Sequence, residues 1–289
     1  MAGPERDPLT GYYTTGHEWD GIKELTTPIP HWWVTVFLVS CIVAAGYVWL
    51  YPSFATTGGY YKGKLGWTSQ GQLAEEITAG RAAQAQWLTA LGATPLEEIE
   101  SNEDLRRFAI AGGRAAFNEN CAACHGIGAG GQIGQFPALV DDDWLWGGKI
   151  ADIHQTISFG IRSGHDETRD SMMPAFADML SAAEIDAVAQ FVLALSDPSK
   201  ADTRKSMPGA ATYETNCASC HGTAGEGGRD FGAPRLNDAI WLYGGTAEEI
   251  RRQIANPRMG MMPAFTGKLD DETIRMLAVY VHTLGGGER

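Results

Sequence analysis

Two copies of one pentapeptide constrain this chain more than any other feature of its sequence. A Cys, two further residues, a second Cys and a His occur at 121–125 and again at 217–221. This spacing is the attachment pattern of c-type haem, in which two thiols bond the porphyrin and the neighbouring imidazole reaches the iron. One copy alone could be a redox dithiol or half of a zinc site, whereas two copies in matching surroundings predict two covalently bound haem c groups. The residues expected to bind them are Cys121, Cys124, His125, Cys217, Cys220 and His221.

An internal repeat surrounds the two motifs. Gly113 and Phe117 precede the first motif as Gly209 and Tyr213 precede the second. The first copy carries about eight extra residues around 164–170, and each copy ends in apolar residues at helical spacing. These are Leu180, Ile185, Val188, Phe191, Val192 and Leu195, matched by Leu269, Ile274, Leu277, Tyr280, Val281 and Leu284. The sequence therefore predicts two tandem α-helical domains of about ninety residues each.

A methionine in each repeat is the candidate for the second axial ligand of each iron. Met173 and Met262 each begin a Met-Pro-Ala-Phe segment, and a thioether paired with an imidazole raises the reduction potential of haem iron. Their neighbours Met172 and Met261 are rival candidates. The remaining histidines of the two repeats do not follow the repeat and are expected to pack or to lie at the surface: His154, His165 and His282.

Three further pairs of repeat positions have expected roles around the haem. The carbonyls near Pro137 and Pro234 are expected to accept the ring N–H of the ligating imidazoles, which would fix ring orientation. Gly113 and Gly209 would let the first helix of each domain approach the last, opposite Phe191 and Tyr280, although a glycine at a helix start is an equal alternative. Surface arginines are common, but two precede the methionine segments and could pair with haem propionates: Arg162 and Arg258.

An uncharged run of twenty residues extends from Trp32 to Tyr51. At 1.5 Å per residue, a helix of this length crosses a hydrocarbon core about 30 Å thick. Aromatic residues cluster at both ends, as at a membrane interface. Thirty net-acidic residues precede the run, so an uncleaved anchor in membrane lipid is expected rather than a signal peptide. Cys41 lies inside this run and is interpreted as a small apolar residue.

The net charge of −13 argues against a nucleic-acid partner, because binding to phosphates requires Lys and Arg. Residues 101–200 alone carry a net charge of −7. This stretch suggests a docking face for a basic protein partner, and such an association would weaken as ionic strength rises.

The two repeats, each with one haem motif and one methionine segment, resemble class I cytochromes c in tandem. The expected organisation is therefore all-α, with one N-terminal transmembrane helix followed by two tandem class I cytochrome c domains. The expected boundaries are 1–30 for an N-terminal segment, 31–54 for the transmembrane helix, 55–100 for a linker with a surface helix, 101–200 for the first cytochrome c domain and 201–289 for the second.

The N-terminal part of the chain also resembles a specific family. Gly16–Leu25, read as GHEWDGIKEL, is followed by Pro28, Pro30, Trp32 and Trp33. Together with one anchor and two haem motifs, this stretch resembles the CcoP or FixP subunit of cbb3-type cytochrome c oxidase. The resemblance covers nearly the whole chain, and the N-terminal stretch is its specific part.

The resemblance implies an electron-transfer subunit with no catalytic site of its own. Such a subunit accepts electrons from a cytochrome c donor and passes them to a monohaem cytochrome subunit and then to the oxygen-reducing haem-copper subunit. It further implies residues 1–30 in the cytoplasm, a single pass through the bacterial inner membrane and haem domains in the periplasm. Met173 and Met262 match the family pattern, with either arrangement of the two ligands open and an exchange between domains favoured by the family. A free-standing dihaem carrier and a dihaem peroxidase are the alternatives.

Overall fold

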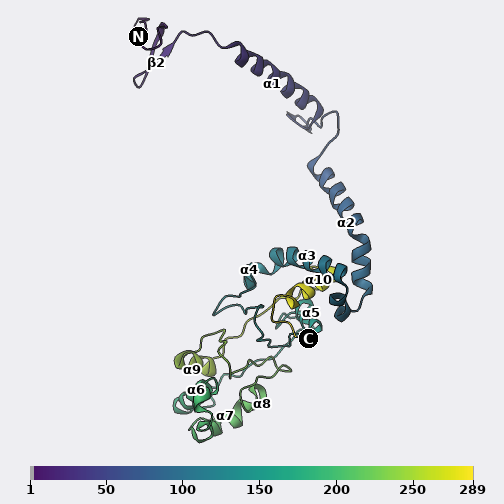
Figure 1. The fold of residues 1–289 in the computed structure, drawn as a ribbon, viewed down its shortest axis with the longest axis vertical. Coiled ribbons are helices and arrows are strands. Elements are labelled where there is room, and N and C mark those ends of the chain that lie inside the picture. Colours follow the sequence, from purple (N-terminus) through teal and green to yellow (C-terminus); the bar gives the residue numbers. More distant parts are fainter. Residues whose placement is uncertain (1–2, 289) are drawn as a thin grey trace. The chain divides into compact units, whose positions relative to one another are not determined.

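The computed structural model describes residues 3–288, which are mostly helical and form two compact units. One unit extends to Ala83 and the other begins at Gln84, so the boundary falls within helix α2 (Ser69–Ala93). The helical character expected around residues 75–91 belongs to this longer helix. Figure 1 labels the elements along the chain.

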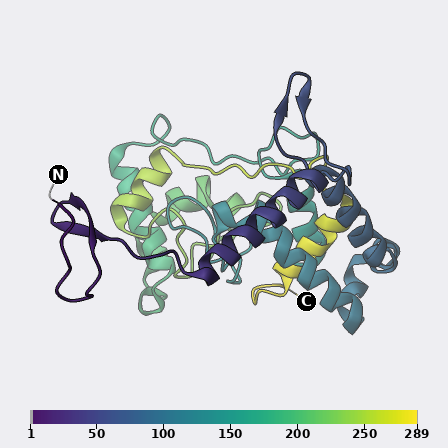
Figure 2. The same ribbon diagram turned by 90° about the horizontal axis from the view of Figure 1, so that it is seen from above.

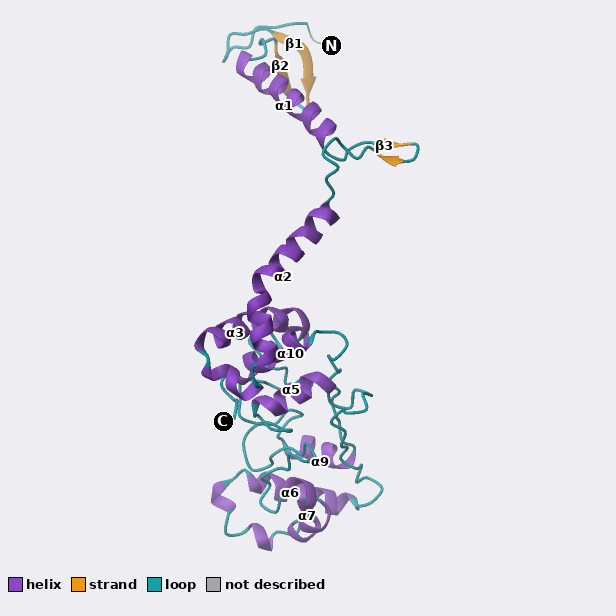
Figure 3. Cartoon of the chain, turned by 90° about the vertical axis from the view of Figure 1, so that its right-hand side faces the viewer, coloured by secondary structure: helices purple, strands orange, loops and turns teal. Residues whose placement is uncertain are grey.

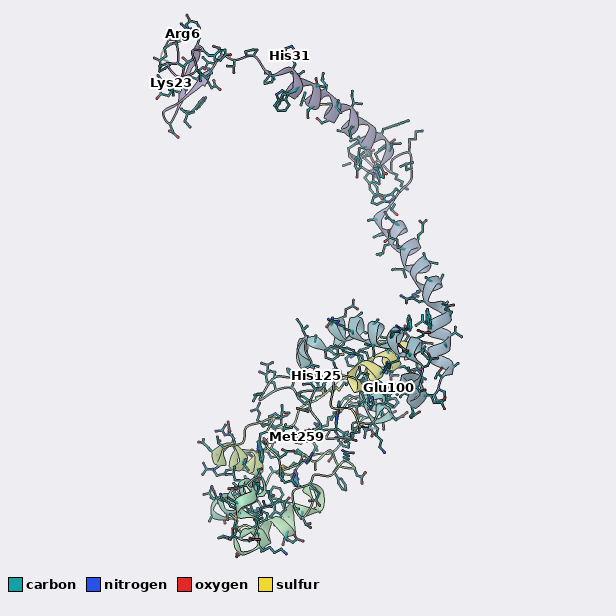
Figure 4. All side chains as sticks on the ribbon, viewed as in Figure 1. Arg6, Lys23, His31, Glu100, His125 and Met259 are labelled. Carbon is teal, nitrogen blue, oxygen red and sulfur yellow. The ribbon has the colours of Figure 1, made fainter. Side chains whose placement is uncertain are left out.

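The first unit contains two small antiparallel hairpins, which Figure 3 shows as its strands. Strands β1 (Thr14–Trp19) and β2 (Ile22–Leu25) join through Asp20 and Gly21, whose positive φ angles of 48° and 84° suit a tight hairpin turn. Lys23 pairs with Glu5 across this region, and Figure 4 labels Lys23 and Arg6 there. The second hairpin joins β3 (Ala55–Thr56) and β4 (Gly59–Tyr60). Neither hairpin was expected from the sequence.

Helix α1 (His31–Leu50) has the length and composition of a membrane-spanning segment. Its mean hydropathy is 2.1 and none of its residues is buried within the protein. Side chains this apolar, exposed along twenty residues, are stable in lipid rather than in water. The helix therefore matches the expected anchor, which begins after Pro30.

The second unit contains two helical lobes, visible as separate groups of helices in Figures 1 and 3. The first lobe comprises a 3₁₀ helix, η1, and four α-helices: η1 (Leu96–Ser101), α3 (Glu103–Asn120), α4 (Ala122–His125), α5 (Ile150–Phe159) and α10 (Asp271–His282). The second lobe comprises α6 (Ala182–Leu195), η2 (Pro198–Lys200), η3 (Arg204–Ser206), α7 (Ala210–Asn216), α8 (Ala218–His221) and α9 (Ala247–Ala255).

The last helix of each repeat packs in the lobe of the other repeat. Helix α10 packs on α3 and α5, and helix α6 packs on α7 and α9. In Figure 2 the yellow helix α10 lies among the blue-green helices of the first repeat. The hydrophobic core of the first lobe therefore combines Ile153 and Phe117 with Leu277, and that of the second combines Ile250 and Tyr213 with Val188. Neither lobe is formed from one continuous repeat.

Two glycines permit the close helix approach that this exchange requires. A Cβ atom at Gly113 would collide with the backbone carbonyl of Met276 on α10, and one at Gly209 would collide with the carbonyl of Ala187 on α6. The expected close approach is therefore confirmed at both glycines. The partner helices are corrected: Gly113 lies against the Tyr280 helix and Gly209 against the Phe191 helix, because α6 and α10 change places.

The end of α2 belongs to the core of the first lobe. Leu91 is fully buried, and the ring of Trp87 stacks on Phe108 at 5.9 Å. The guanidinium of Arg275 donates to the carbonyl of Leu91 at 3.1 Å and also to that of Thr94, which satisfies carbonyls at the end of the helix. The stretch expected to be a linker with a surface helix thus ends as a packed part of the lobe.

Candidate haem sites

The first thiol-imidazole motif follows the end of α3 directly. Cys121 caps α3, and the single turn of α4 carries the chain to Cys124 and His125. The Nδ1 atom of His125 lies 3.0 Å from the carbonyl oxygen of Pro137. With the proton on Nδ1, this nitrogen donates to the carbonyl and leaves the lone pair of Nε2 free for a metal. Figure 4 labels His125 in the first lobe.

The second motif repeats this geometry. Cys217 caps α7, and Nδ1 of His221 lies 3.0 Å from the carbonyl oxygen of Pro234. The hydroxyl of Tyr213 donates to the carbonyl of Gly222 at 2.8 Å and ties helix α7 to the turn after the motif. The predicted contact between a proline carbonyl and the ligating imidazole is therefore confirmed in both lobes.

Burial sets the protonation of both motifs. It lowers the pKa of His125 and of His221, against a smaller opposing effect of the proline carbonyl, so both rings favour the neutral form that binds metal. Burial also raises the pKa of the Cys121 thiol and of the Cys217 thiol to about 11 each. All four motif cysteines are free of disulfide bonds.

Each methionine segment lies in the lobe that contains the cysteine motif of the other repeat. Met262 packs against the first core cluster together with Cys121, and Met173 packs against the second together with Cys217. Backbone hydrogen bonds hold the Met262 segment to the end of α5, with Met262 N to Ile161 O at 2.9 Å and the reverse bond at 3.0 Å.

The methionine segment of the second lobe is held to α9, where Phe176 N donates to the carbonyl of Ile254 at 3.2 Å, as Phe265 N donates to that of Ile157 at 3.2 Å in the first lobe. The rival methionines are mostly exposed instead: Met172 is 69% exposed and Met261 is 68% exposed. Of the two adjacent methionines in each repeat, the one that precedes the proline therefore packs against a core cluster and the other does not.

The donor groups in each lobe fit a c-type haem. Each lobe offers two free thiols, an imidazole with Nε2 available and a thioether in the same core cluster. Among residues 3–288, no group of three or more His, Cys, Asp or Glu side chains is arranged to hold another metal ion. The chemistry of the donor set is that of His and Met ligation at a thioether-linked porphyrin.

The remaining candidate residues support the seam between the lobes or pack within one lobe. Arg162 donates to the carbonyls of Gly260 and Ser171 at 2.7 and 2.8 Å, and Arg258 donates to the carbonyl of Gly134 at 2.7 Å. These arginines, singled out as partners for propionates, thus hold loops of the two repeats together. Nothing in a single sequence predicts the contacts of Arg162 with Gly260 and of Arg258 with Gly134, because they join residues 98 and 124 positions apart.

The three histidines outside the repeat have structural partners. His282 contacts Glu100 at 2.8 Å through Nδ1 and the carbonyl of Glu288 through Nε2, also at 2.8 Å. The Nδ1 atom of His165 accepts from the backbone of Glu167, and His154 lies 3.8 Å from Asp271 on α10. The expectation that they pack or lie at the surface agrees with these contacts.

Known protein families match both the N-terminal part of the chain and its two lobes. Residues 11–58 match the N-terminal domain of cytochrome oxidase-cbb3, FixP, and residues 108–192 and 205–281 match cytochrome c oxidase, cbb3-type, subunit III. The chain is 46% identical to the cbb3-type cytochrome c oxidase subunit CcoP of Azospirillum brasilense, with 100% of both chains covered. It is 47% identical to the FixP subunit of Azorhizobium caulinodans, with 98% of this chain and 96% of that protein covered.

These matches cover the hairpin and anchor as well as both lobes, so they concern the whole chain rather than the haem motifs alone. They establish a c-type cytochrome with an electron-transfer role in a membrane oxidase. The chain is a member of the subunit III (CcoP/FixP) family of cbb3-type cytochrome c oxidases.

Proposed function

We propose that this chain is the electron-entry subunit of its oxidase in aerobic respiration. It accepts electrons from a cytochrome c donor and relays them to the monohaem and haem-copper subunits of a cbb3-type terminal oxidase. The observation that carries the proposal is the presence of two like donor sets, each a cysteine motif packed with a methionine segment. Two bound haem c groups would each supply a reversible one-electron couple.

The protein residues position the donors and tune them. The hydrogen bond from each histidine Nδ1 to a proline carbonyl fixes the tautomer and the ring plane, and increases the basicity of Nε2. The methionine thioether, as a soft ligand, favours the reduced iron and raises the potential. With an imidazole and a thioether both bound, neither iron would keep a position open to oxygen, so we assign oxygen reduction to the partner subunits.

The packing favours ligands exchanged between the repeats. We assign Met262 as the partner of His125 and Met173 as the partner of His221, because each methionine packs in the cluster of that cysteine motif. The exchange of α6 and α10 carries the methionine segments with it, since each segment immediately precedes the exchanged helix.

The attachment chemistry favours one orientation in the membrane. Haem is joined to c-type apocytochromes outside the cytoplasm, so both lobes lie in the periplasm and residues 1–30 lie in the cytoplasm. Helix α1 then crosses the inner membrane once.

Loss of one axial ligand at a time tests the ligand assignment. Met262→Ala, made in the full chain, should leave the iron bound to His125 open to peroxide, which destroys an accessible haem. Mass spectrometry should then show haem loss from the Cys121–His125 peptide, whereas Met173→Ala should give loss from the Cys217–His221 peptide. Met261→Ala and Met172→Ala are matched controls, in which both peptides should keep their haem. The opposite pattern for Met262 and Met173 would show ligands within each repeat.

Purification from mildly solubilised membranes tests the relay. Copurification with haem-copper and monohaem subunits, and loss of cytochrome c oxidation when this chain is deleted, are the expected results. A solitary dihaem protein would favour a free carrier instead. Peroxide turnover by the intact chain would favour a peroxidase.

A further inference from the structure

The loop that follows the first cysteine motif is uncharged and exposes two isoleucines. Residues 126–136 read GIGAGGQIGQF and include no Asp, Glu, Lys or Arg. Ile127 is 81% exposed and Ile133 is 88% exposed. Single apolar side chains at a surface are common, but two in an uncharged loop of eleven residues are an unusual concentration.

The backbone of this loop, termed here the 126–136 loop, is held in place by hydrogen bonds. Ala129 is fully buried, and its N–H bonds the carbonyl of Gly126 at 3.0 Å while its carbonyl accepts from Leu139 N at 2.7 Å. The N–H of Gly134 donates to the carbonyl of Leu242 in the second repeat at 2.6 Å. Both isoleucines thus extend from an ordered backbone, so little conformational entropy is lost when a partner covers them.

The 126–136 loop is anchored on the Nδ1 side of the His125 ring. The loop leads to Pro137, whose carbonyl contacts Nδ1 of His125. A haem iron at this motif would be bound by Nε2, the other ring nitrogen. The hydrogen bond that anchors the loop is therefore on the side of the imidazole away from the metal-binding nitrogen.

The equivalent loop of the second repeat has a different surface. Residues 222–233 read GTAGEGGRDFGA, with Thr223 in place of Ile127 and with Glu226, Arg229 and Asp230 all exposed. Phe231 is exposed as well, at 50%, but is flanked by the charges of Arg229 and Asp230. The two repeats share the cysteine motif and differ in the chemistry of the surface beside it.

We propose that the 126–136 loop is the face by which the first lobe docks permanently on another subunit of the oxidase. The partner surface would be apolar and uncharged. Permanent interfaces are apolar and depleted of charge at their centre, whereas transient complexes of electron carriers rely on charged groups for steering. The charged loop 222–233 suits solvent or a transient partner better. Combined with the proposed function, this docking makes the first-lobe haem the exit of the electron relay.

Site-specific crosslinking in the intact oxidase tests the contact. Ile127→Cys is made with Cys41→Ser, so that the new thiol is the only one outside the haem motifs, and is labelled with a benzophenone maleimide. Illumination should join position 127 to an integral oxidase subunit. Thr223→Cys, labelled in the same way, is the matched control and should not give that product. Crosslinking of position 127 to added soluble cytochrome c, or to no other subunit, would overturn the proposal.

Charge insertion gives an independent readout. Ile127→Glu combined with Ile133→Glu should lower retention of this chain on the purified oxidase about tenfold or more, since each tenfold corresponds to only 1.4 kcal/mol. The haem content of the membranes should not change, which excludes a folding defect, and Thr223→Glu should retain the chain. Normal retention with a raised KM for cytochrome c would identify a donor site and refute permanent docking. A wild-type chain that purifies alone would refute the oxidase relay itself, which is a different outcome from an intact oxidase without a crosslink at position 127.

Discussion

The two lobes share the same arrangement of motif, helices and methionine segment. They differ in which other elements of the chain pack against them and stabilise them. The first lobe is braced by the end of α2, by η1 and by the hydrogen bond between Glu100 and His282. The second lobe has a seven-residue helix α7, preceded by two short 3₁₀ helices, where the first lobe has the eighteen-residue α3. The first lobe thus depends on residues both before and after those of the second lobe, whereas the second lobe lies within one intervening stretch of the chain.

The aromatic pairs in the two cores show the same exchange. Phe117 meets Tyr280 at 5.5 Å between ring centroids, and Tyr213 meets Phe191 at 4.9 Å. Each lobe consequently contains one Phe and one Tyr from different repeats. Packing within each repeat would instead pair two Phe rings in one lobe and two Tyr rings in the other.

Removal of α10 is expected to have the largest effect on this comparison. A chain that ends after Asp270 should lose most of the stability of the first lobe, where folded domains have about 5–15 kcal/mol in total. Hydrogen exchange should show loss of protection in α3 and α5, with α7 and α9 protected as before. Loss of protection in α7 and α9 instead would mean that each repeat folds with its own last helix.

A pair of point variants controls for the severity of this truncation. Leu277 on α10 and Val188 on α6 occupy equivalent repeat positions and are both fully buried. Leu277→Ala should destabilise the first lobe and Val188→Ala the second.

Leu91→Ala should sharpen the difference in support. Removing this fully buried side chain is expected to cost about 3 kcal/mol in the free energy of unfolding of the first lobe, through lost burial and a residual cavity. Hydrogen exchange in α3 and α10 would measure the loss, with α6 and α9 as internal references. Leu73→Ala, at a position on α2 that is 56% exposed, is the control. Equal destabilisation by Leu91→Ala and Leu73→Ala would mean that the end of α2 does not specifically stabilise the first lobe.

Adjacent glycines in α3 offer a finer comparison. Gly113→Ala should cost about 2 kcal/mol, because its Cβ would collide with the fixed backbone carbonyl of Met276. Gly112→Ala should cost less, because there the obstacle is the flexible side chain of the same methionine. Thermal unfolding of the two variants gives the order, and a larger loss for Gly112→Ala would contradict the packing of α10 on α3.

The sequence predicted the parts of this molecule but not which parts pack together. Local spacing can be read from a single sequence. It predicted the cysteine motif, the repeat, the anchor and the contacts at Pro137 and Pro234. It did not predict the exchange of α6 and α10, because Ile185 and Ile274 present the same apolar pattern to either lobe. Gly113 predicted a close helix approach, yet a glycine carries no information about which of two similar helices approaches it.

Removal of one negative charge, at Asp143, where the two repeats meet, is expected to have the smallest effect on stability. Asp143 in the first repeat is half-buried, and burial, followed by repulsion from Asp238 of the second repeat, raises its pKa to about 6, although Arg235 opposes this. An aspartate in the unfolded chain titrates near pH 3.9, so the folded state loses stability as pH rises from about 4 to about 6. Asp143→Asn should therefore stabilise the protein at pH 7.5 by on the order of 1 kcal/mol, reduced from the full shift by solvent screening. The gain should shrink as pH falls from about 6 to about 4, because Asp143 is then protonated in the folded state and is becoming protonated in the unfolded chain as well. Thermal unfolding at pH 7.5 and at pH 4 measures the gain, with exposed Asp142→Asn as the control. A gain that does not depend on pH would mean that the pKa of Asp143 is not raised in the folded state.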